Sequence, residues 1–398
     1  MLKKALKRVS VINQTNAYLR SKQQERWAER GLAGYRAEAE RKGIVCLEGE
    51  GLRRELRRRL RERRPGYAAK AKGDLHIFLA YYISNWEAVL PEALAPLGKV
   101  SAFEWRSCGF DDRKEDWLEH RDAMNRAMLE AFHKANQEAP VDAVVGYLSG
   151  NNTAPEVLQE MAESGAMIFN FCWDDKLRFP GKLRGGRYVS PAAIAHAVDL
   201  NLTNAPDSVI KYAMHGGLSM FWPEAAHPDW HKPYDVPFEF DVSFVGGRYG
   251  WRPHFIGKLI KRGITVKCFG PGWENGALSD EEMIKLYSRS RINLGFGGVA
   301  HSRKLMCLKG RDFEVPMSGG LYLTQDNPEL SLVYEVGKEI ETYRDEANCA
   351  RIIRELLADP DRAAAIRRAG RQRCLRDHTY EARWAEVLRL SGLMKEYV

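Results

Sequence analysis

The sequence predicts an α/β protein with two doubly wound, Rossmann-like domains, and three observations lead to this fold class. The first is length, because 398 residues suit two domains better than one. The second is a series of short apolar runs after Gly73 that carry almost no charge, as strands buried on both faces do. The third is the alternation of these runs with longer helical stretches, which is typical of parallel sheets made of βαβ units.

Four strands are expected in each half of the chain. They are Leu75–Ala80, Ala143–Gly146, Met167–Phe171 and Leu200–Leu202 in the first half, and Val242–Val245, Val266–Phe269, Ile292–Leu294 and Leu321–Thr324 in the second. Between the two sets, the segment Phe221–Phe238 contains four prolines, a density that prevents regular structure. We therefore expect the boundary there, with an N-terminal domain at 71–232 and a C-terminal domain at 233–380.

Helices are expected at both ends of the chain. Residues 1–70 are polar and have a helical pattern, so they form a helical extension. Near the other end, Asp359-Pro360 predicts the start of a helix, with aspartate as the cap and proline at the first position. A last helix follows His378-Thr379-Tyr380 and makes 381–398 a separate C-terminal element.

The positive charge of the chain is concentrated near its beginning. The net charge is +8, yet residues 1–70 hold 20 Lys and Arg against 8 Asp and Glu, while the remainder holds 41 against 45. Nucleic-acid binding by the whole chain is therefore not expected. Leu52–Leu60 repeats leucine every four residues on an arginine-rich surface, and Pro65-Gly66 ends this basic helix. Two interpretations stay open: a solvated helix packed on the body, or contact with an anionic surface such as a membrane face or an acidic polysaccharide.

Cysteine usage and hydropathy favour a cytoplasmic location. The seven cysteines are scattered and form no CxxC pair, so neither a disulfide framework nor a zinc site is expected. The sequence has no apolar run near the roughly 18 residues that cross a bilayer, and no signal peptide is recognised. We expect a cytoplasmic protein, peripheral at the inner membrane face if residues 1–70 bind anionic lipid.

A first cluster suited to phosphate binding is Phe244–Arg248, where an apolar strand runs into Gly246, Gly247 and Arg248. Glycines let the backbone approach a ligand, and the helix that follows would direct its amides to the same place. The arginine adds a fixed cation. The same pattern also fits an ordinary turn between a strand and a helix.

A second cluster, Lys309–Gly320, is more specific. It places Lys309, Arg311 and Glu314 within six residues, and Gly319-Gly320 and an apolar strand follow. Cations can neutralise a diphosphate, and a carboxylate can accept hydrogen bonds from sugar hydroxyls. A helical turn would put Arg311 and Glu314 on one face, where a surface salt bridge between them is the alternative interpretation.

A series of motifs runs in order along about 150 residues of the second half. They are Val242–Arg248, Val266–Trp273, Glu282–Tyr287, Ile292–Gly295, Lys309–Gly320, Glu339-Ile340, Tyr343 and His378–Tyr380. This series resembles the glycosyltransferase group 1 domain, and most closely its spore-maturation CgeB-like branch. The resemblance implies the GT-B architecture, in which two doubly wound domains face a cleft and the last helix packs back on the N-terminal domain.

The resemblance also implies which residues of the C-terminal domain bind a nucleotide sugar. Glu314 matches the family's glutamate on the nucleotide ribose, and Lys309 and Arg311 match the region that faces the diphosphate. Other expected donor-binding positions are Gly246, Gly247 and Arg248 in the first glycine-rich turn, Phe269 and Gly270 in the loop that borders the base, and Gly319 and Gly320 at the end of the Lys309–Gly320 cluster.

One position departs from the family pattern. Many members carry two glutamates eight positions apart, and the first lies near the donor sugar. Here Met306 stands eight positions before Glu314, so the contacts to the sugar stay open. His301 and Arg303 lie nearby in sequence and are possible substitutes.

The N-terminal domain offers candidates for binding and activating the acceptor. Asp174 and Asp175 follow an expected strand, where one could act as a general base, and neighbouring carboxylates raise each other's pKa. Capping of the next helix is the alternative. Tyr82, Ser84 and Asn85 follow the first strand and, in the GT-B layout, would face the cleft together with His301. Packing of the aromatic rings in the core is the alternative for this loop.

These features predict a glycosyltransferase that moves a sugar from a UDP- or GDP-sugar to a carbohydrate, lipid-linked or protein acceptor, as in polysaccharide biosynthesis. Arg311, with Lys309 and Arg248, would offset the charge that grows on the leaving diphosphate, so neither a metal nor a cofactor is expected. The main alternative is a catalytically inactive GT-B scaffold that still binds nucleotide. A sugar epimerase or a phosphorylase is a second alternative, although no lysine motif for pyridoxal phosphate is present.

Overall fold

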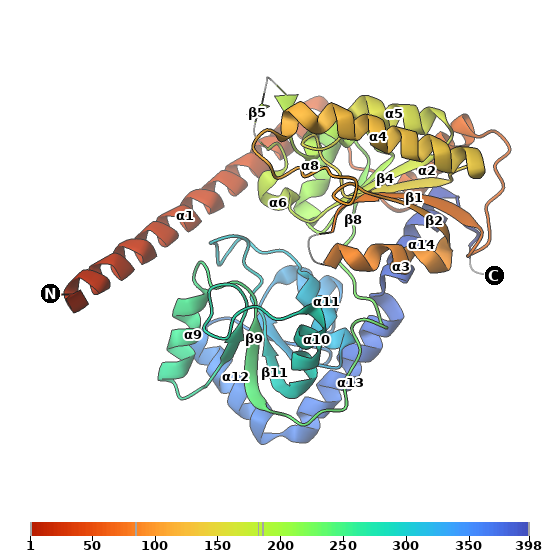
Figure 1. The fold of residues 1–398 in the computed structure, drawn as a ribbon. Coiled ribbons are helices and arrows are strands. Elements are labelled where there is room, and N and C mark those ends of the chain that lie inside the picture. Colours follow the sequence, from red (N-terminus) through yellow and green to blue (C-terminus); the bar gives the residue numbers. More distant parts are fainter. Residues whose placement is uncertain (1, 84–85, 182, 185–186, 397–398) are drawn as a thin grey trace. The chain divides into compact units, whose positions relative to one another are not determined.

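The fold contains two parallel β-sheets, one in each of two compact structural units (Figure 1). The structure is a computed structural model and describes residues 2–83, 86–181, 183–184 and 187–396. The C-terminal unit comprises Met1–Arg30 and Glu224–Thr379, and the N-terminal unit comprises Gly31–Pro223 and Tyr380–Val398. This is the doubly wound α/β architecture that the sequence predicted, with its N-terminal helical extension.

The N-terminal unit is built on a six-stranded sheet in the order β2-β1-β3-β4-β7-β8, in which every neighbouring pair is parallel. Its strands are β1 (Leu75–Tyr81), β2 (Gly98–Glu104), β3 (Ala143–Gly146), β4 (Met167–Cys172), β7 (Leu200–Thr203) and β8 (Ser219–Phe221), beside a separate hairpin of β5 (Leu183–Arg184) and β6 (Arg187–Tyr188).

Helices cover both faces of this sheet. Its helices are α2 (Gly49–Arg63), α3 (Leu90–Leu94), α4 (Trp117–Glu138), α5 (Pro155–Glu163), α6 (Asp175–Arg178), α7 (Pro191–Ile194), α8 (Val209–Met214) and α14 (Tyr380–Ser391). Alternate strand residues such as Phe78 pack with α4 and α5, and Phe132 of α4 meets the Phe78 ring edge-on at 5.5 Å. On the other face Phe171 contacts Trp384 of α14, with ring centroids 5.8 Å apart.

The C-terminal unit is built on a five-stranded parallel sheet in the order β10-β9-β11-β12-β13. Its strands are β9 (Phe240–Val245), β10 (Lys267–Phe269), β11 (Ser290–Leu294), β12 (Tyr322–Gln325) and β13 (Glu341–Tyr343), and its helices are α9 (Arg252–Lys261), α10 (Asp280–Arg289), α11 (Gly310–Met317), α12 (Glu346–Ala358) and α13 (Pro360–Asp377). The core joins strand residues such as Val242 and Ile292 to Phe255 of α9 and Ile353 of α12. Helix α11 packs on α13.

All eight expected strands are present, and their bounds differ by one or two residues at some ends. Strands β2, β8 and β13 were not expected, and each of them lies at an edge of its sheet. An edge strand has a single neighbour, so its residues need not be apolar. Strand β13 reads Glu-Thr-Tyr, and β2 leaves Lys99 exposed, which explains why a search for apolar runs passes over them.

The expected helices at the C-terminal end are confirmed. Helix α13 begins at Pro360, and the Asp359 carboxylate accepts a hydrogen bond from the Arg362 N–H at 3.0 Å. Helix α14 follows and contacts α2 and α3. The proline-rich stretch between β8 and β9 forms no helix or strand, but from Glu224 onward it groups with the C-terminal unit, ahead of the expected boundary at 232/233.

The basic extension consists of α1 (Leu2–Lys42) and α2. Leu52, Leu56 and Leu60 of α2 are buried, so this helix is packed on the body, as the first of the two interpretations expected. Contact of residues 1–70 with an anionic surface stays a prediction. Among the described residues, every helix is too short or too polar to span a bilayer.

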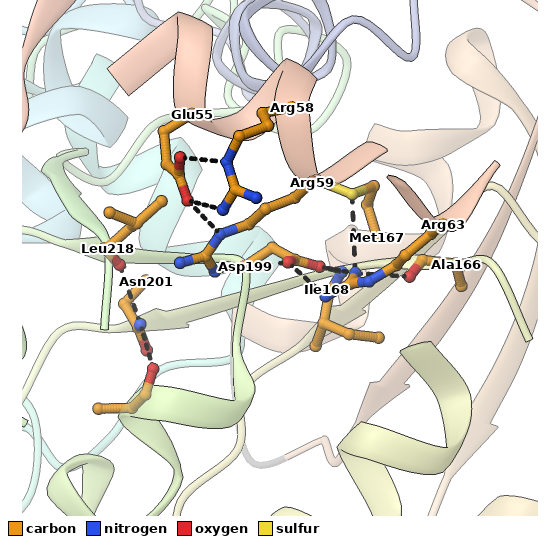
Figure 2. A network of polar contacts seen from close by, with 11 residues as sticks. Glu55, Arg58, Arg59, Arg63, Ala166, Met167, Ile168, Asp199, Asn201 and Leu218 are labelled. Atoms are coloured by element: carbon orange, nitrogen blue, oxygen red, sulfur yellow. Dashed lines mark hydrogen bonds and ion pairs between the residues drawn. The ribbon is translucent and has the colours of Figure 1, made fainter. Parts of the chain in front are cut away.

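The arginines at the end of α2 hold two buried aspartates at the amino edge of the N-terminal sheet. Asp199 lies directly before β7, accepts the Ile168 N–H at 2.8 Å and forms a two-point ion pair with Arg63 (Figure 2). Asp142 lies directly before β3, accepts the His76 N–H at 2.8 Å and pairs with Arg64 at 3.0 Å. Each carboxylate thus joins a neighbouring strand to α2, and the guanidinium groups offset the cost of burying it.

Replacement of Asp199 by asparagine removes a buried charge and leaves Arg63 without its partner. We expect the free energy of unfolding to fall by about 2 kcal/mol, less than the roughly 3–5 kcal/mol of a fully buried broken pair, because Arg63 is partly exposed. Urea denaturation of the purified protein measures this change. Asp241→Asn is a matched control, because Asp241 is largely exposed and pairs with Arg291 at the surface, so a change within about 0.5 kcal/mol is expected. An equal loss in both variants would contradict the structural role of Asp199.

Candidate functional site

The carboxyl edge of the C-terminal sheet brings together most of the predicted binding residues. In the order β10-β9-β11-β12-β13, the chain reverses direction across the sheet between β9 and β11, and open α/β sheets bind ligands outside the carboxyl ends of their strands at such a point. Gly246 directly follows β9, Gly270 directly follows β10, and the loop after β11 leads to the first residue of α11, Gly310. The candidate ligand site therefore lies in the loops that follow β9, β10 and β11.

The turns after β9 and β10 are bound to each other. The Gly246 N–H donates to the Phe269 oxygen and the Arg248 N–H to the Pro271 oxygen, each at 2.9 Å. The Trp273 indole N–H donates to the Gly246 oxygen at 2.7 Å. A Cβ at Gly270 would lie 2.6 Å from the Gly246 oxygen, so this close approach requires glycine at position 270.

Two arginines flank these turns, and the sequence predicted one of them. Arg248 is exposed, and its guanidinium lies 5.6 Å from the centre of the Trp273 ring. Arg252, the first residue of α9, donates to the Gly247 oxygen at 3.1 Å and stacks on Tyr249 at 4.2 Å. Burial lowers the pKa of Arg252, and the charge of Arg311 lowers it further. Its position at the helix start after a glycine turn was the available sequence signal for a second cation here.

Helix α11 begins where the second cluster predicted a helical turn. The Asp312 carboxylate accepts the Lys309 N–H at 2.7 Å, which fixes the first turn as half of a capping box. Burial raises the pKa of Asp312 to about 6. Arg311 donates to the Met283 sulfur at 3.7 Å, and Glu314 accepts from the Tyr287 hydroxyl at 3.5 Å. Both side chains are therefore directed to α10, which carries Met283 and Tyr287.

Lys309 and Arg311 are half-buried cations. The Lys309 ammonium lies 2.9 Å from the Cys307 sulfur. Burial alone would lower the pKa of Lys309, but Cys307 and then Glu224 outweigh it and raise the pKa. Burial likewise opposes the charge of Arg311, whereas Tyr287 and Glu314 raise its pKa overall. Both groups stay positively charged near neutral pH.

The sequence did not predict Glu224 at this site. Glu224 belongs to the proline-rich segment between β8 and β9, and one of its carboxylate oxygens lies so near Gly310 that a Cβ there would be 2.8 Å from it. The same Cβ would lie 2.7 Å from an oxygen of Glu314. The carboxylates of Glu224 and Glu314 therefore both lie beside Gly310, whose neighbours in the chain are the two cations.

The loop between β11 and α11 is anchored by the N-terminal helix. Ser302 donates to the Glu25 carboxylate of α1 at 2.7 Å, and its oxygen accepts the Leu305 N–H at 2.8 Å. His301 lies beside Tyr249, with ring centroids 6.2 Å apart, so it borders the first glycine turn. Arg303 pairs with Glu346 of α12 at 3.4 Å, and its guanidinium lies 4.5 Å from the centre of the Trp251 ring.

Gly319 and Gly320 lie at the other end of α11 from Lys309. They connect the helix to the amino end of β12, and the Gly320 N–H donates to the Val315 oxygen at 3.0 Å. An eight-residue helix is about 12 Å long. The structure therefore assigns these two glycines to the turn that ends the helix rather than to the cluster at its start.

In the N-terminal unit the two adjacent aspartates have different surroundings. Asp174 is exposed at the cap position of α6. Asp175 is fully buried and accepts a hydrogen bond from the Tyr212 hydroxyl at 2.9 Å. Burial raises the pKa of Asp175 to about 6, against the lowering effects of Thr203 and Lys211. The raised pKa thus comes from burial rather than from the neighbouring carboxylate, and Asp174 is the carboxylate that an acceptor could reach.

The predicted loop after β1 is only partly described. Tyr82 is half-buried, and the guanidinium of Arg106 lies over its ring at 3.9 Å, with the Trp105 ring 5.2 Å away. These contacts agree with the alternative that the aromatic ring is packed. Ser84 and Asn85 lie outside the described residues.

Comparison with known proteins agrees with the resemblance at the level of fold and class. Residues 252–389 match the family described as "Glycosyl transferase-like". No curated protein matches the sequence. Among solved structures, Anabaena HepE in complex with UDP aligns with a TM-score of 0.52 and 11% identity, over 79% of this chain and all of HepE. Sucrose-phosphate synthase from Thermosynechococcus elongatus aligns with a TM-score of 0.53 and 12% identity, over 80% of this chain and 98% of its own.

A third similar structure is a glycosyltransferase from Rickettsia africae, with a TM-score of 0.50, 10% identity and coverage of 80% of this chain and 98% of its own. These comparisons show a GT-B-like α/β fold, and residues 252–389 are similar to the glycosyl transferase-like family.

The raised pKa of Asp175 predicts a specific dependence of stability on pH. The folded state keeps this carboxyl protonated up to about pH 6, whereas the unfolded chain loses the proton near pH 4. The folded state therefore binds more protons between these values, and the contribution of Asp175 to stability falls as pH rises from about 4 to about 6. We expect Asp175→Asn to remove this loss of stability, which totals on the order of 3 kcal/mol between pH 4 and pH 6, in urea denaturation at a series of pH values. An unchanged pH dependence would show that folding does not raise the pKa of Asp175.

Proposed function

We propose that this protein transfers a sugar from a nucleoside-diphosphate sugar to an acceptor hydroxyl, and that the C-terminal domain binds the donor. The observation that carries the proposal is the pair of half-buried cations, Lys309 and Arg311, beside Glu314 at the start of α11. A diphosphate needs fixed positive charge, and ribose hydroxyls need an acceptor such as a carboxylate. A uridine nucleotide is the first choice, because HepE, with the same fold, binds UDP.

Different elements of the proposed donor site bind the phosphates and the base. The N-terminus of α11 lies at the carboxyl edge of the sheet, and a helix start favours a bound anion. In the turn after β9, the Gly246 and Arg248 N–H groups instead donate to the loop after β10. Arg252, held on the Gly247 oxygen, adds a third cation beside this turn. Phe269 and Gly270 form the turn next to it, where we place the border of the base.

In the proposed reaction the bond between the anomeric carbon and the diphosphate oxygen breaks, and a new bond forms from that carbon to the acceptor oxygen. Negative charge grows on the leaving diphosphate, and Lys309 and Arg311 stabilise it. The proton of the acceptor hydroxyl passes to a base, for which Asp174 is our candidate because it is exposed. The acceptor is a hydroxyl group of a glycan, a glycolipid or a protein.

Arg311→Ala tests the role of this cation. We expect the rate of sugar transfer or of donor hydrolysis to fall at least tenfold, because the charge on the leaving group loses a preorganised partner. Release of UDP from UDP-glucose measures the rate. Arg351→Ala is the matched control, since Arg351 is an exposed residue of α12, and its rate should stay within about twofold of wild type. Wild-type turnover by Arg311→Ala would refute the assignment.

The same charge argument predicts that transfer does not depend on a divalent metal. Because the two cations of α11 supply the positive charge that a metal would otherwise provide, we expect UDP release to continue at an undiminished rate in excess EDTA. A rate that falls with EDTA and returns on addition of Mg²⁺ or Mn²⁺ would contradict this part of the proposal.

A further inference from the structure

The segment that carries Glu224 is fixed on the C-terminal unit. Ala226 forms a parallel bridge with Thr379, and its N–H donates to the His378 oxygen at 3.0 Å. The His378 ring in turn packs edge-on against Phe313 of α11, with centroids 5.2 Å apart. Ala225 and Ala226 are both buried. The backbone beside Glu224 is therefore tied to α11 through His378.

The position of the Glu224 carboxylate follows from this attachment. Glu224 and Glu314 approach the Cα atom of Gly310 from two elements, the segment after β8 and the first turns of α11. A Cβ at position 310 would lie 2.7 Å from a Glu314 oxygen and 2.8 Å from a Glu224 oxygen, so glycine lets both carboxylates lie there without turning aside. Glu224 also interacts electrostatically with Lys309 and with Arg311.

Two carboxylates beside two cations restrict the chemistry of the ligand. A site for phosphate alone is weakened by carboxylates, because like charges repel. Carboxylates become favourable when the ligand also carries hydroxyl groups, which donate strong hydrogen bonds to them. The cluster thus matches a phosphate group flanked by hydroxyl-bearing rings, which is the chemistry of a sugar linked through a diphosphate to ribose.

We propose that Glu224 binds the hydroxyls of the transferred sugar. The inference rests on the proposed function, in which the diphosphate lies on Lys309 and Arg311 and Glu314 serves the ribose. The diphosphate joins two hydroxyl-bearing groups, the ribose and the sugar. When the diphosphate binds the two cations, Glu314 serves the ribose and Glu224 remains for the sugar. Glu224 then supplies a carboxylate for the donor sugar from outside the motif around α11, where Met306 stands eight positions before Glu314.

The test compares binding of a nucleotide sugar with binding of the nucleotide alone. Calorimetric titrations of the full-length protein use UDP-glucose, UDP-N-acetylglucosamine and GDP-mannose, together with UDP and GDP. For the pair that binds wild type, we expect Glu224→Gln to weaken the nucleotide sugar about tenfold or more and to change the nucleotide less than about twofold. Glu314→Gln should weaken both. Glu335→Gln, at an exposed carboxylate of the same unit, should leave both affinities unchanged.

Each outcome separates this inference from the proposed function. If wild type binds a nucleotide sugar and Glu224→Gln binds it equally well, the role of Glu224 is wrong and the donor site stands. Equal weakening of nucleotide and nucleotide sugar would also overturn it, because Glu224 would then act on the shared nucleotide. If wild type binds none of the probes, the proposed function itself fails. Melting curves of the variants without ligand, expected to match wild type, exclude loss of the fold as the cause.

Discussion

The balance of charge around Gly310 is the constraint on which the candidate donor site depends. Lys309 and Arg311 are half-buried, so they need nearby negative charge or an anionic ligand, and Glu224 and Glu314 supply part of it. Because residue 310 has no side chain, both carboxylates lie beside it without turning aside. A nucleotide sugar completes the balance, since its phosphates meet the cations and its hydroxyls meet the carboxylates.

At the amino edge of the N-terminal sheet, buried charge stabilises the fold. Asp142 and Asp199 are buried beneath the arginines of α2, so much of the basic extension is used inside the N-terminal unit. In the C-terminal unit, Glu25 of α1 holds Ser302 in the loop that leads to α11. The extension that stood out in the sequence by charge alone therefore contributes to the folded body of both units.

Local pattern predicted the buried strands and the helix caps well, because burial on both faces demands apolar runs and Asp359-Pro360 determines its own helix start. Edge strands such as β13 were missed, since their single neighbour imposes no such pattern. The sequence did not predict Glu224, because the pattern of the proline-rich segment does not indicate the β-bridge between Ala226 and Thr379 that places Glu224 beside α11. Gly319 and Gly320 follow the expected helical turn in sequence and end α11 in the structure, and their contact with a donor stays a prediction.

Hydrogen–deuterium exchange of the full-length protein with and without UDP-glucose locates the donor along the chain. If the donor binds at the carboxyl edge of the C-terminal sheet, exchange slows in peptides that cover 245–252, 269–276 and 306–315, where the glycine turns and the start of α11 lie. Peptides that cover β1 and β3 then show no change. Binding of UDP-glucose that protects other segments and leaves these three unchanged would contradict the placement of the donor at the carboxyl edge of the C-terminal sheet.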